Sequence, residues 1–298
     1  RSAVRDHVAS DAVRGVEDNL SPNTTGAADT GASNAITSFD SDGWSMGSDG
    51  LWNANTETFV AWNWKGGGSG SANTDGTLAS TVSANTTAGF SIVAYTPTTG
   101  SATTVGHGLS QKPDLIIVKD REASTNWPVY QSPQGATYVV WLDDNSASTS
   151  SGATGYWNDT EPTASVFTVG DSSQTGGNTN DYISYVFHSV EGYSKVGSYT
   201  GNSSADGTFI YTGFRPAYFM IKSTSLASEW FIYDDTRPGY HVTNLSLKAD
   251  VNSAEETTYK LDYVSNGVKL RINDSTINTG TYLFISFSKF PFKYSNAR

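Results

Sequence analysis

The pattern that decides the fold occurs three times, as TFVAWNWK (58–65), DYISYVFH (181–188) and TYLFISFS (281–288). Each stretch has a polar residue followed by an aromatic one, then apolar residues that alternate with small or polar ones. Such alternation over a short run is typical of a β-strand with one buried face. Corresponding aromatic positions are Phe59, Tyr182 and Tyr282, then Trp64, Phe187 and Phe287. We therefore expect repeated β-units that each close with this strand.

Longer stretches repeat around this strand. KPDLIIVKDREASTNWPVY (112–130) returns as RPAYFMIKSTSLASEWFIY (215–233). The match pairs Trp127 with Trp230, and Tyr130 with Tyr233. Aromatic residues at corresponding positions of a repeat are expected to have the same place in each core. We therefore predict that these four residues are structural anchors.

The first 65 residues join the same scheme. DAVRGVEDNL (11–20) resembles residues 234–245, and SDGWSMGSD (41–49) resembles residues 265–274. The first match pairs Asp11 with Asp234, and Arg14 with Arg237. Both matched stretches belong to the second half of a repeat, so a first half is missing here. We expect the chain to be a fragment of a longer polypeptide.

The repeats divide the chain into four segments. Residues 1–65 are expected to form the C-terminal half of a first unit, and residues 66–88 a linker rich in Gly and Ser. Residues 89–195 and 196–298 are expected to form two complete units, related by duplication. We call these three parts the first, second and third units.

Composition supports an all-β chain. Aromatic residues make up 12% and charged residues 16% of the chain, a combination typical of short aromatic strands joined by polar turns. Strands at this spacing predict tandem β-sandwiches or jelly rolls of about 100 residues each. Only residues 1–20 give a weak indication of helix.

Charge and apolar runs exclude several classes of protein. The net charge is −11, and no cluster of Lys or Arg stands out, which disfavours a nucleic-acid binder. No apolar run approaches the ~20 residues of a membrane helix, so no membrane insertion is expected. The chain has no Cys, which excludes disulfides and thiolate metal sites and suits synthesis in a reducing cytosol.

The polar loop around Trp157 is the candidate binding site. Tyr156, Trp157, Asn158 and Asp159 follow one another in TGYWNDTEP. Exposed aromatic rings stack on sugar rings, and Asn and Asp can bond sugar hydroxyls, so this loop is predicted to bind glycan. The alternative is that Trp157 folds back onto its own unit.

Signals for metals and catalysis are weak. Asp40, Asp42 and Asp49 in DSDGWSMGSDG (40–50) could begin a calcium loop, but a hairpin turn explains the same residues. The four histidines lie in separate segments without metal spacing, and no cofactor is expected.

Paired carboxylates would be needed for a glycosidase. The carboxylate doublets are Asp143-Asp144, Asp234-Asp235 and Glu255-Glu256. Neighbouring residues on a strand point to opposite faces, so no doublet supplies a facing catalytic pair by itself. We expect no enzyme activity, although a more distant carboxylate pair stays open.

A resemblance covers nearly the whole chain. KPDLIIVK (112–119), YWNDTEPTASVFTVG (156–170) and the closing PFKYSNAR (291–298) resemble a repeated domain of tailed-bacteriophage virion proteins, often described as lectin-like. The resemblance implies a location in the virion, assembled in the host cytoplasm and later extracellular. It also implies contacts with other virion subunits and a homo-oligomer, expected to be a trimer.

Together these observations give three functional hypotheses. The first is a tail fibre or tailspike module that recognises host-surface polysaccharide. The second is a capsid decoration protein that mainly contacts other virion subunits. The third is a polysaccharide-degrading tail enzyme.

Overall fold

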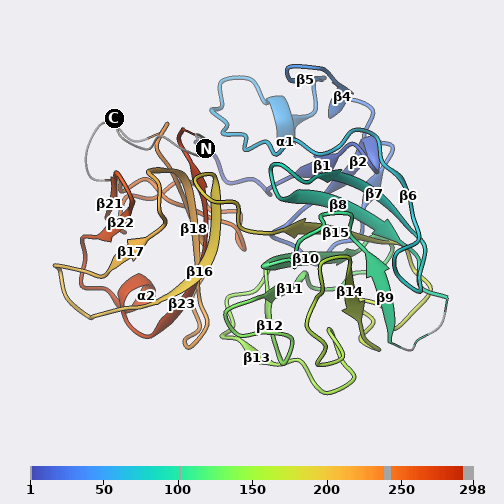
Figure 1. Ribbon diagram of the computed structural model, residues 1–298. Coiled ribbons are helices and arrows are strands. Elements are labelled where there is room, and N and C mark those ends of the chain that lie inside the picture. The colour runs from blue at the N-terminus through green and yellow to red at the C-terminus, as the bar shows by residue number, and fades with distance from the viewer. Residues whose placement is uncertain (1, 99, 101, 238–242, 291–298) are drawn as a thin grey trace.

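The computed structural model describes residues 2–98, 100, 102–237 and 243–290 (Figure 1). The chain is all-β, as predicted, and its strands pair antiparallel in several sheets. Two single-turn helices, α1 (Gly50–Asn53) and α2 (Ser275–Asn278), interrupt the strands. The closing motif at residues 291–298 lies outside the described residues.

The second unit is a sandwich of a large and a small sheet. The large sheet has the order β13-β12-β11-β10-β15-β8-β7-β6. Its strands are β6 (Ser71–Asn73), β7 (Ser80–Asn85), β8 (Phe90–Tyr95), β10 (Leu115–Asp120), β11 (Pro128–Gln131), β12 (Tyr138–Trp141), β13 (Thr149–Ser150) and β15 (Tyr182–Phe187). The small sheet pairs β9 (Thr103–Gly106) with β14 (Val166–Val169). Val93 and Ile116 from the large sheet share one core with Phe167 from the small one.

The third unit has the same two-layer construction. Its larger sheet has the order β16-β23-β18-β19-β20, and its smaller sheet the order β17-β22-β21. The strands are β16 (Ser194–Thr200), β17 (Phe209–Tyr211), β18 (Pro216–Ser223), β19 (Phe231–Asp234), β20 (Leu247–Lys248), β21 (Leu261–Val264), β22 (Gly267–Leu270) and β23 (Thr281–Ser288). Phe219 and Phe284 from the larger sheet pack in one core with Val268 from the smaller one.

Strands that match in sequence occupy matching places. The order β8-β15-β10-β11-β12 in the second unit corresponds to β16-β23-β18-β19-β20 in the third. The closing strand lies inside each sheet and pairs with a neighbour on both sides. A central strand must present apolar side chains to both layers, which explains the aromatic and β-branched residues of this stretch. The boundaries of the units stay a prediction.

The first unit contains two small sheets, of order β1-β2-β3 and β4-β5. Its strands are β1 (Ala9–Asp11), β2 (Gly15–Leu20), β3 (Asp29–Thr30), β4 (Ile36–Phe39) and β5 (Trp44–Met46). The helical indication for residues 1–20 is wrong, because this stretch forms the β1–β2 hairpin. Gly15, the first residue of β2 after the turn, adopts a φ of 102°, a conformation that favours glycine.

Residues 58–65 do not form the predicted strand. They carry no strand pairing in the structure and are partly exposed. In the other two units the closing strand is held by two neighbours from the first half of the same unit, such as β8 and β10. The described residues of the first unit supply no such neighbours, so an apolar alternating sequence alone does not make a strand here.

Residues 66–88 are only in part a linker. β6 and β7 lie within this segment and extend the sheet of the second unit beyond β8. The glycines before them allow a close approach: a Cβ at Gly67 would overlap the Ala84 carbonyl oxygen. The open edge of β8 has backbone groups that need partners, and β7 supplies them.

The three units meet at an aromatic junction formed by Trp64, Phe187 and Phe287. These residues hold the same position in the three copies of the closing pattern. Their ring centroids lie 6.2 Å apart for Trp64–Phe187, 5.6 Å for Trp64–Phe287 and 6.0 Å for Phe187–Phe287. Three equivalent rings in mutual contact indicate an approximate threefold arrangement of the units.

Corresponding contacts run around this junction in one direction. At one position of each unit, a ring nitrogen hydrogen-bonds to a main-chain carbonyl of a neighbouring unit. The pairs are His7 Nε2 with Lys248 O (2.7 Å), Trp127 Nε1 with Thr24 O (3.0 Å) and Trp230 Nε1 with Trp141 O (2.7 Å). The first unit thus contacts the third, the second the first, and the third the second. The ring of units is closed.

Two buried lysines reinforce the same interfaces. Lys119 Nζ donates to the Thr25 carbonyl of the first unit at 2.9 Å, and Lys222 Nζ donates to the Asp144 carbonyl of the second unit at 3.2 Å. Each also donates to a carbonyl of its own unit, Thr125 at 2.6 Å and Ser228 at 2.5 Å. Burial lowers the pKa of both lysines to about 8.

A turn motif also recurs, with an i,i+3 pair whose first member is the last residue of a strand. Asp11 accepts from the Arg14 backbone N–H (2.9 Å) and Nε (2.6 Å), and Asp234 accepts from Arg237 with the same two lengths. In the second unit Gln131 and Gln134 form the corresponding pair, with the Gln134 backbone N–H donating to Gln131 Oε1 at 3.0 Å. The shared chemistry is a side chain that closes the turn.

Candidate binding surfaces

The loop predicted to bind glycan does not present its tryptophan. Trp157 is 1% exposed and packs edge-on against Tyr130, with ring centroids 5.9 Å apart. Asn158 and Asp159, with φ of 51° and 44°, turn the chain so that Trp157 enters the core. Tyr156 is half-buried against Trp141. The predicted stacking role of Trp157 is therefore wrong, and the alternative that it folds back onto its unit holds.

The predicted anchors all lie in hydrophobic cores. Trp127 and Trp230 belong to the cluster shared by the three units, while Tyr130 and Tyr233 belong to the cores of the second and third units. The Tyr130 hydroxyl donates to Glu161 Oε2 at 2.7 Å. Paired positions in the sequence therefore have paired places in the structure.

Two of the three acidic residues proposed for calcium, Asp40 and Asp49, do separate structural work. Asp40 lies in the β4–β5 turn, where its backbone N–H donates to Gly43 at 2.9 Å and its side chain accepts from Ser45. Asp49 caps α1 by accepting from the Leu51 backbone N–H at 2.7 Å. Within the described part of the chain, no group of three or more His, Cys, Asp and Glu residues could hold a metal ion.

The carboxylate doublets hold structural hydrogen bonds. Asp143 accepts from the Trp127 backbone N–H at 2.8 Å, and Asp234 and Glu255 both pair with Arg237. Asp250 accepts from the Trp230 backbone N–H at 3.1 Å, and burial raises its pKa to about 6. These side chains make hydrogen bonds within interfaces and turns. A catalytic carboxylate would instead need to face a substrate cleft.

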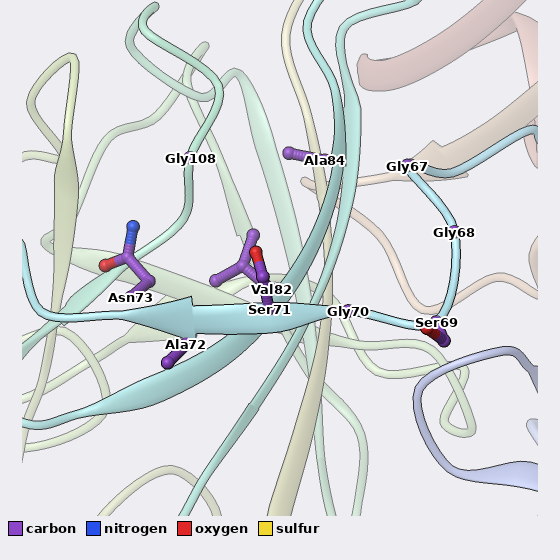
Figure 2. Close-up of a pocket in the computed structure, with 10 residues that line it drawn as sticks. All are labelled: Gly67, Gly68, Ser69, Gly70, Ser71, Ala72, Asn73, Val82, Ala84 and Gly108. Carbon is purple, nitrogen blue, oxygen red and sulfur yellow. The ribbon is translucent and has the colours of Figure 1, made fainter.

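A shallow groove follows the glycine-rich entry to β6. It has a volume of about 410 Å³ and is lined by Gly67–Asn73 together with Val82, Ala84 and Gly108 (Figure 2). Its polar side chains are Ser69, Ser71 and Asn73, and none of its lining residues is charged. A groove lined by backbone and small side chains offers no group for acid–base chemistry.

An exposed aromatic strip lies on β17, at the edge of the three-stranded sheet. Phe209 is 45% exposed and Tyr211 57% exposed, while Ile210 between them is buried. A Cβ at Gly267 would lie 2.9 Å from Phe209 Cε2, so the Phe209 ring lies against the sheet at this glycine. We call Phe209, Tyr211 and their neighbours Lys195 and Lys269 the β17 face.

Polar groups surround these two rings. Lys195 Nζ lies 4.9 Å from the centroid of the Tyr211 ring and donates to the Tyr211 carbonyl at 3.1 Å. Lys269, opposite Phe209 across the sheet, forms an ion pair with Asp206 at 2.7 Å. Aromatic rings beside hydrogen-bonding groups are the composition that a sugar site uses.

The fold does not require this exposure. In the second unit the corresponding strand β9 carries Thr104 and Gly106 and is covered by the chain before β7. There the Leu78 backbone N–H donates to the Thr104 carbonyl at 3.0 Å, and a Cβ at Gly106 would overlap Asn73 Oδ1. Sequence reasoning missed the β17 face, although the alternation Phe209-Ile210-Tyr211 already places both rings on one side.

A second exposed apolar surface lies on the first unit. We call it the first-unit face; it consists of Phe39, Trp44, Met46, Trp52 and Phe59. The rings of Trp44 and Trp52 are 5.8 Å apart, and Phe39, Met46 and Phe59 are exposed. At corresponding positions the third unit buries Tyr263, Val268, Leu270, Ile277 and Tyr282. This surface therefore corresponds to the face that a sandwich layer normally buries against a second layer. Within the described residues no second layer covers it.

Fold and surfaces together define an all-β protein of two-layer units with two exposed aromatic surfaces, one on β17 and one on the first unit. A family model described as a domain of unknown function (DUF7483) matches residues 1–291, and the chain belongs to this family. No curated protein and no solved structure matches the chain. Among the described residues, no helix is long and apolar enough to cross a membrane.

Proposed function

We propose that this chain is a structural protein of a tailed-phage virion, a tail fibre or tailspike module that recognises host-surface glycan. The observation that carries the recognition role is the β17 face, where two aromatic rings are exposed. The corresponding strand of the second unit, β9, is covered by the chain before β7. The location in the virion rests on the sequence resemblance.

The scaffold suits such a role because hydrogen bonds and a shared hydrophobic cluster hold its three units together. The closed ring of units fixes β17 relative to the rest of the molecule, and stacking on a sugar depends on rings that are already in place. Lys195 and Asp206 offer hydrogen-bond partners for hydroxyl groups beside the rings.

Binding of the purified chain to host-type surface polysaccharides tests this proposal, with the bound glycan recovered and sized. Recovery of intact glycan supports a binding module. Shortened glycan would favour the polysaccharide-degrading enzyme, and failure to retain any glycan would contradict the recognition role.

Capsid decoration is the second candidate function, and the first-unit face favours it. Five apolar side chains at positions that are buried in the third unit form a surface suited to another polypeptide. Contacts with virion subunits, or a homotrimer, would cover such a surface. Sedimentation of the chain over a range of concentrations tests self-association: a monomer at all concentrations would contradict the trimer.

A further inference from the structure

We infer that the β17 face takes an acidic saccharide, with a sugar ring stacked on the exposed aromatic strip and its carboxylate group on Lys195. This inference rests on the proposed glycan recognition and names the chemical class of the ligand.

The two rings form the apolar part of the site. Phe209 and Tyr211 lie on the same side of β17, because residues two apart on a strand share a face. Their Cα atoms are separated by about 7 Å along the strand, which lets one saccharide chain contact both rings. Gly267 pairs with Tyr211 and has no side chain, so nothing projects from the sheet between the two rings and β21.

Lys195 supplies the charge preference. It lies over the Tyr211 ring and forms no ion pair among the described residues. Several other cations are matched by a carboxylate: Lys112 pairs with Glu161, Lys269 with Asp206 and Arg271 with Asp262. In a chain of net charge −11, a cation held at an aromatic ring without a carboxylate partner is a ready site for an acid group.

Two structural roles compete with ligand binding. Phe209 covers Gly267, a role that stabilises a sheet, and a lysine on the edge strand β16 discourages pairing with another chain. Truncation of Phe209 would therefore cost stability whether or not a sugar binds. Lys195 and Tyr211 are better test positions, because neither fills a core. The Tyr211 ring lies near Gly213, where a Cβ would be 3.6 Å from the Tyr211 hydroxyl oxygen, but this glycine belongs to the bend after β17 and not to the sheet.

The test is calorimetric titration with an alginate hexasaccharide, in which every residue carries a carboxylate, and with maltohexaose, which carries none. Wild-type chain should bind alginate more tightly, with an affinity that falls as salt is added. Lys195→Gln should weaken alginate binding about tenfold and reduce its salt dependence. Tyr211→Ser should weaken binding by a similar factor.

Matched controls separate the site from general charge. Lys65→Gln removes an exposed lysine of the first unit that forms no ion pair within the described ranges, and Tyr138→Ser removes an exposed tyrosine of β12. Both should stay within about twofold of wild type. Alginate binding that survives Lys195→Gln and Tyr211→Ser in folded protein would overturn the inference.

The outcome also distinguishes this inference from the proposed function. A chain that retains host-type polysaccharide but prefers maltohexaose to alginate, or binds neither, would overturn the acidic ligand and leave glycan recognition standing. A chain that binds no glycan in either experiment would overturn both.

Discussion

At the scale of single residues, the buried lysines make the stability of the protein depend on pH. Burial lowers the pKa of Lys119 and Lys222 to about 8, whereas an unfolded lysine titrates near 10.4. Between these values the unfolded chain binds more protons, so the free energy of unfolding rises as pH increases from about 8. Burial raises the pKa of tyrosines such as Tyr199, and this reverses the trend above about pH 10.

Lys119→Met should therefore flatten the increase in stability between about pH 8 and 10, because it removes one of the two titrating groups. Urea unfolding at several pH values measures this slope. Lys65→Met, at an exposed lysine, is the control and should leave the slope unchanged. A slope that Lys119→Met does not alter would show that Lys119 titrates normally.

Trp157 gives the second prediction at this scale. Its indole is buried against Tyr130, so Trp157→Ala should lower the free energy of unfolding by about 3–5 kcal/mol, as much as Trp230→Ala. Trp44→Ala, on the partly exposed first-unit face, should cost clearly less. A Trp157→Ala variant as stable as wild type would mean that the indole lies outside the core.

At the scale of elements, β5 and β22 match in sequence but differ in burial. Met46 is 41% exposed and the corresponding Leu270 is 0% exposed. Leu270→Ser should cost about 3 kcal/mol or more, because it leaves a cavity and buries a hydroxyl. Met46→Ser should change stability by no more than about 0.5 kcal/mol. Denaturant unfolding of the two variants side by side checks this contrast.

Gly43 and Gly267 offer a second matched pair. A Cβ at Gly267 would overlap the Ile210 carbonyl oxygen of β17, whereas a Cβ at Gly43 has nothing within 4 Å. Gly267→Ala should therefore destabilise the chain by about 1–3 kcal/mol, and Gly43→Ala should be close to neutral. Thermal unfolding measures both. Equal melting temperatures would contradict the close packing of β17 on β22.

The elements also show how far sequence reasoning reaches. Alternation and repetition predicted the all-β fold and the correspondence of β15 with β23, because these signals are local and occur more than once. The state of residues 58–65 could not be predicted, because strand formation depends on partners far away in the chain. The inward turn of Trp157 depends on the left-handed backbone at Asn158 and Asp159, which a polar composition does not reveal.

At the scale of the whole molecule, the units share one hydrophobic cluster. Ile92 of the second unit and Ile285 of the third lie in the cluster that Trp64 of the first unit packs against. Units that bury surface against one another in this way unfold together. We expect a single transition, with near-UV and far-UV circular dichroism changing at the same temperature.

Phe187→Ala, at the aromatic junction, should lower the free energy of unfolding by about 3–5 kcal/mol. The variant should still unfold in a single transition. Differential scanning calorimetry measures both properties. Two separated transitions in the wild-type protein would show that the units are stable independently of one another.

The closed ring of three units has a consequence for how the molecule can vary. In an assembly of three identical chains, every substitution appears at three places at once. Here His7 stands where Trp127 and Trp230 stand in the other units, and each makes its hydrogen bond to a neighbouring carbonyl. One chain can therefore keep a trimer-like arrangement while the sequence of each unit changes independently. The surface of a single unit can be altered for a new ligand without changing the other two units.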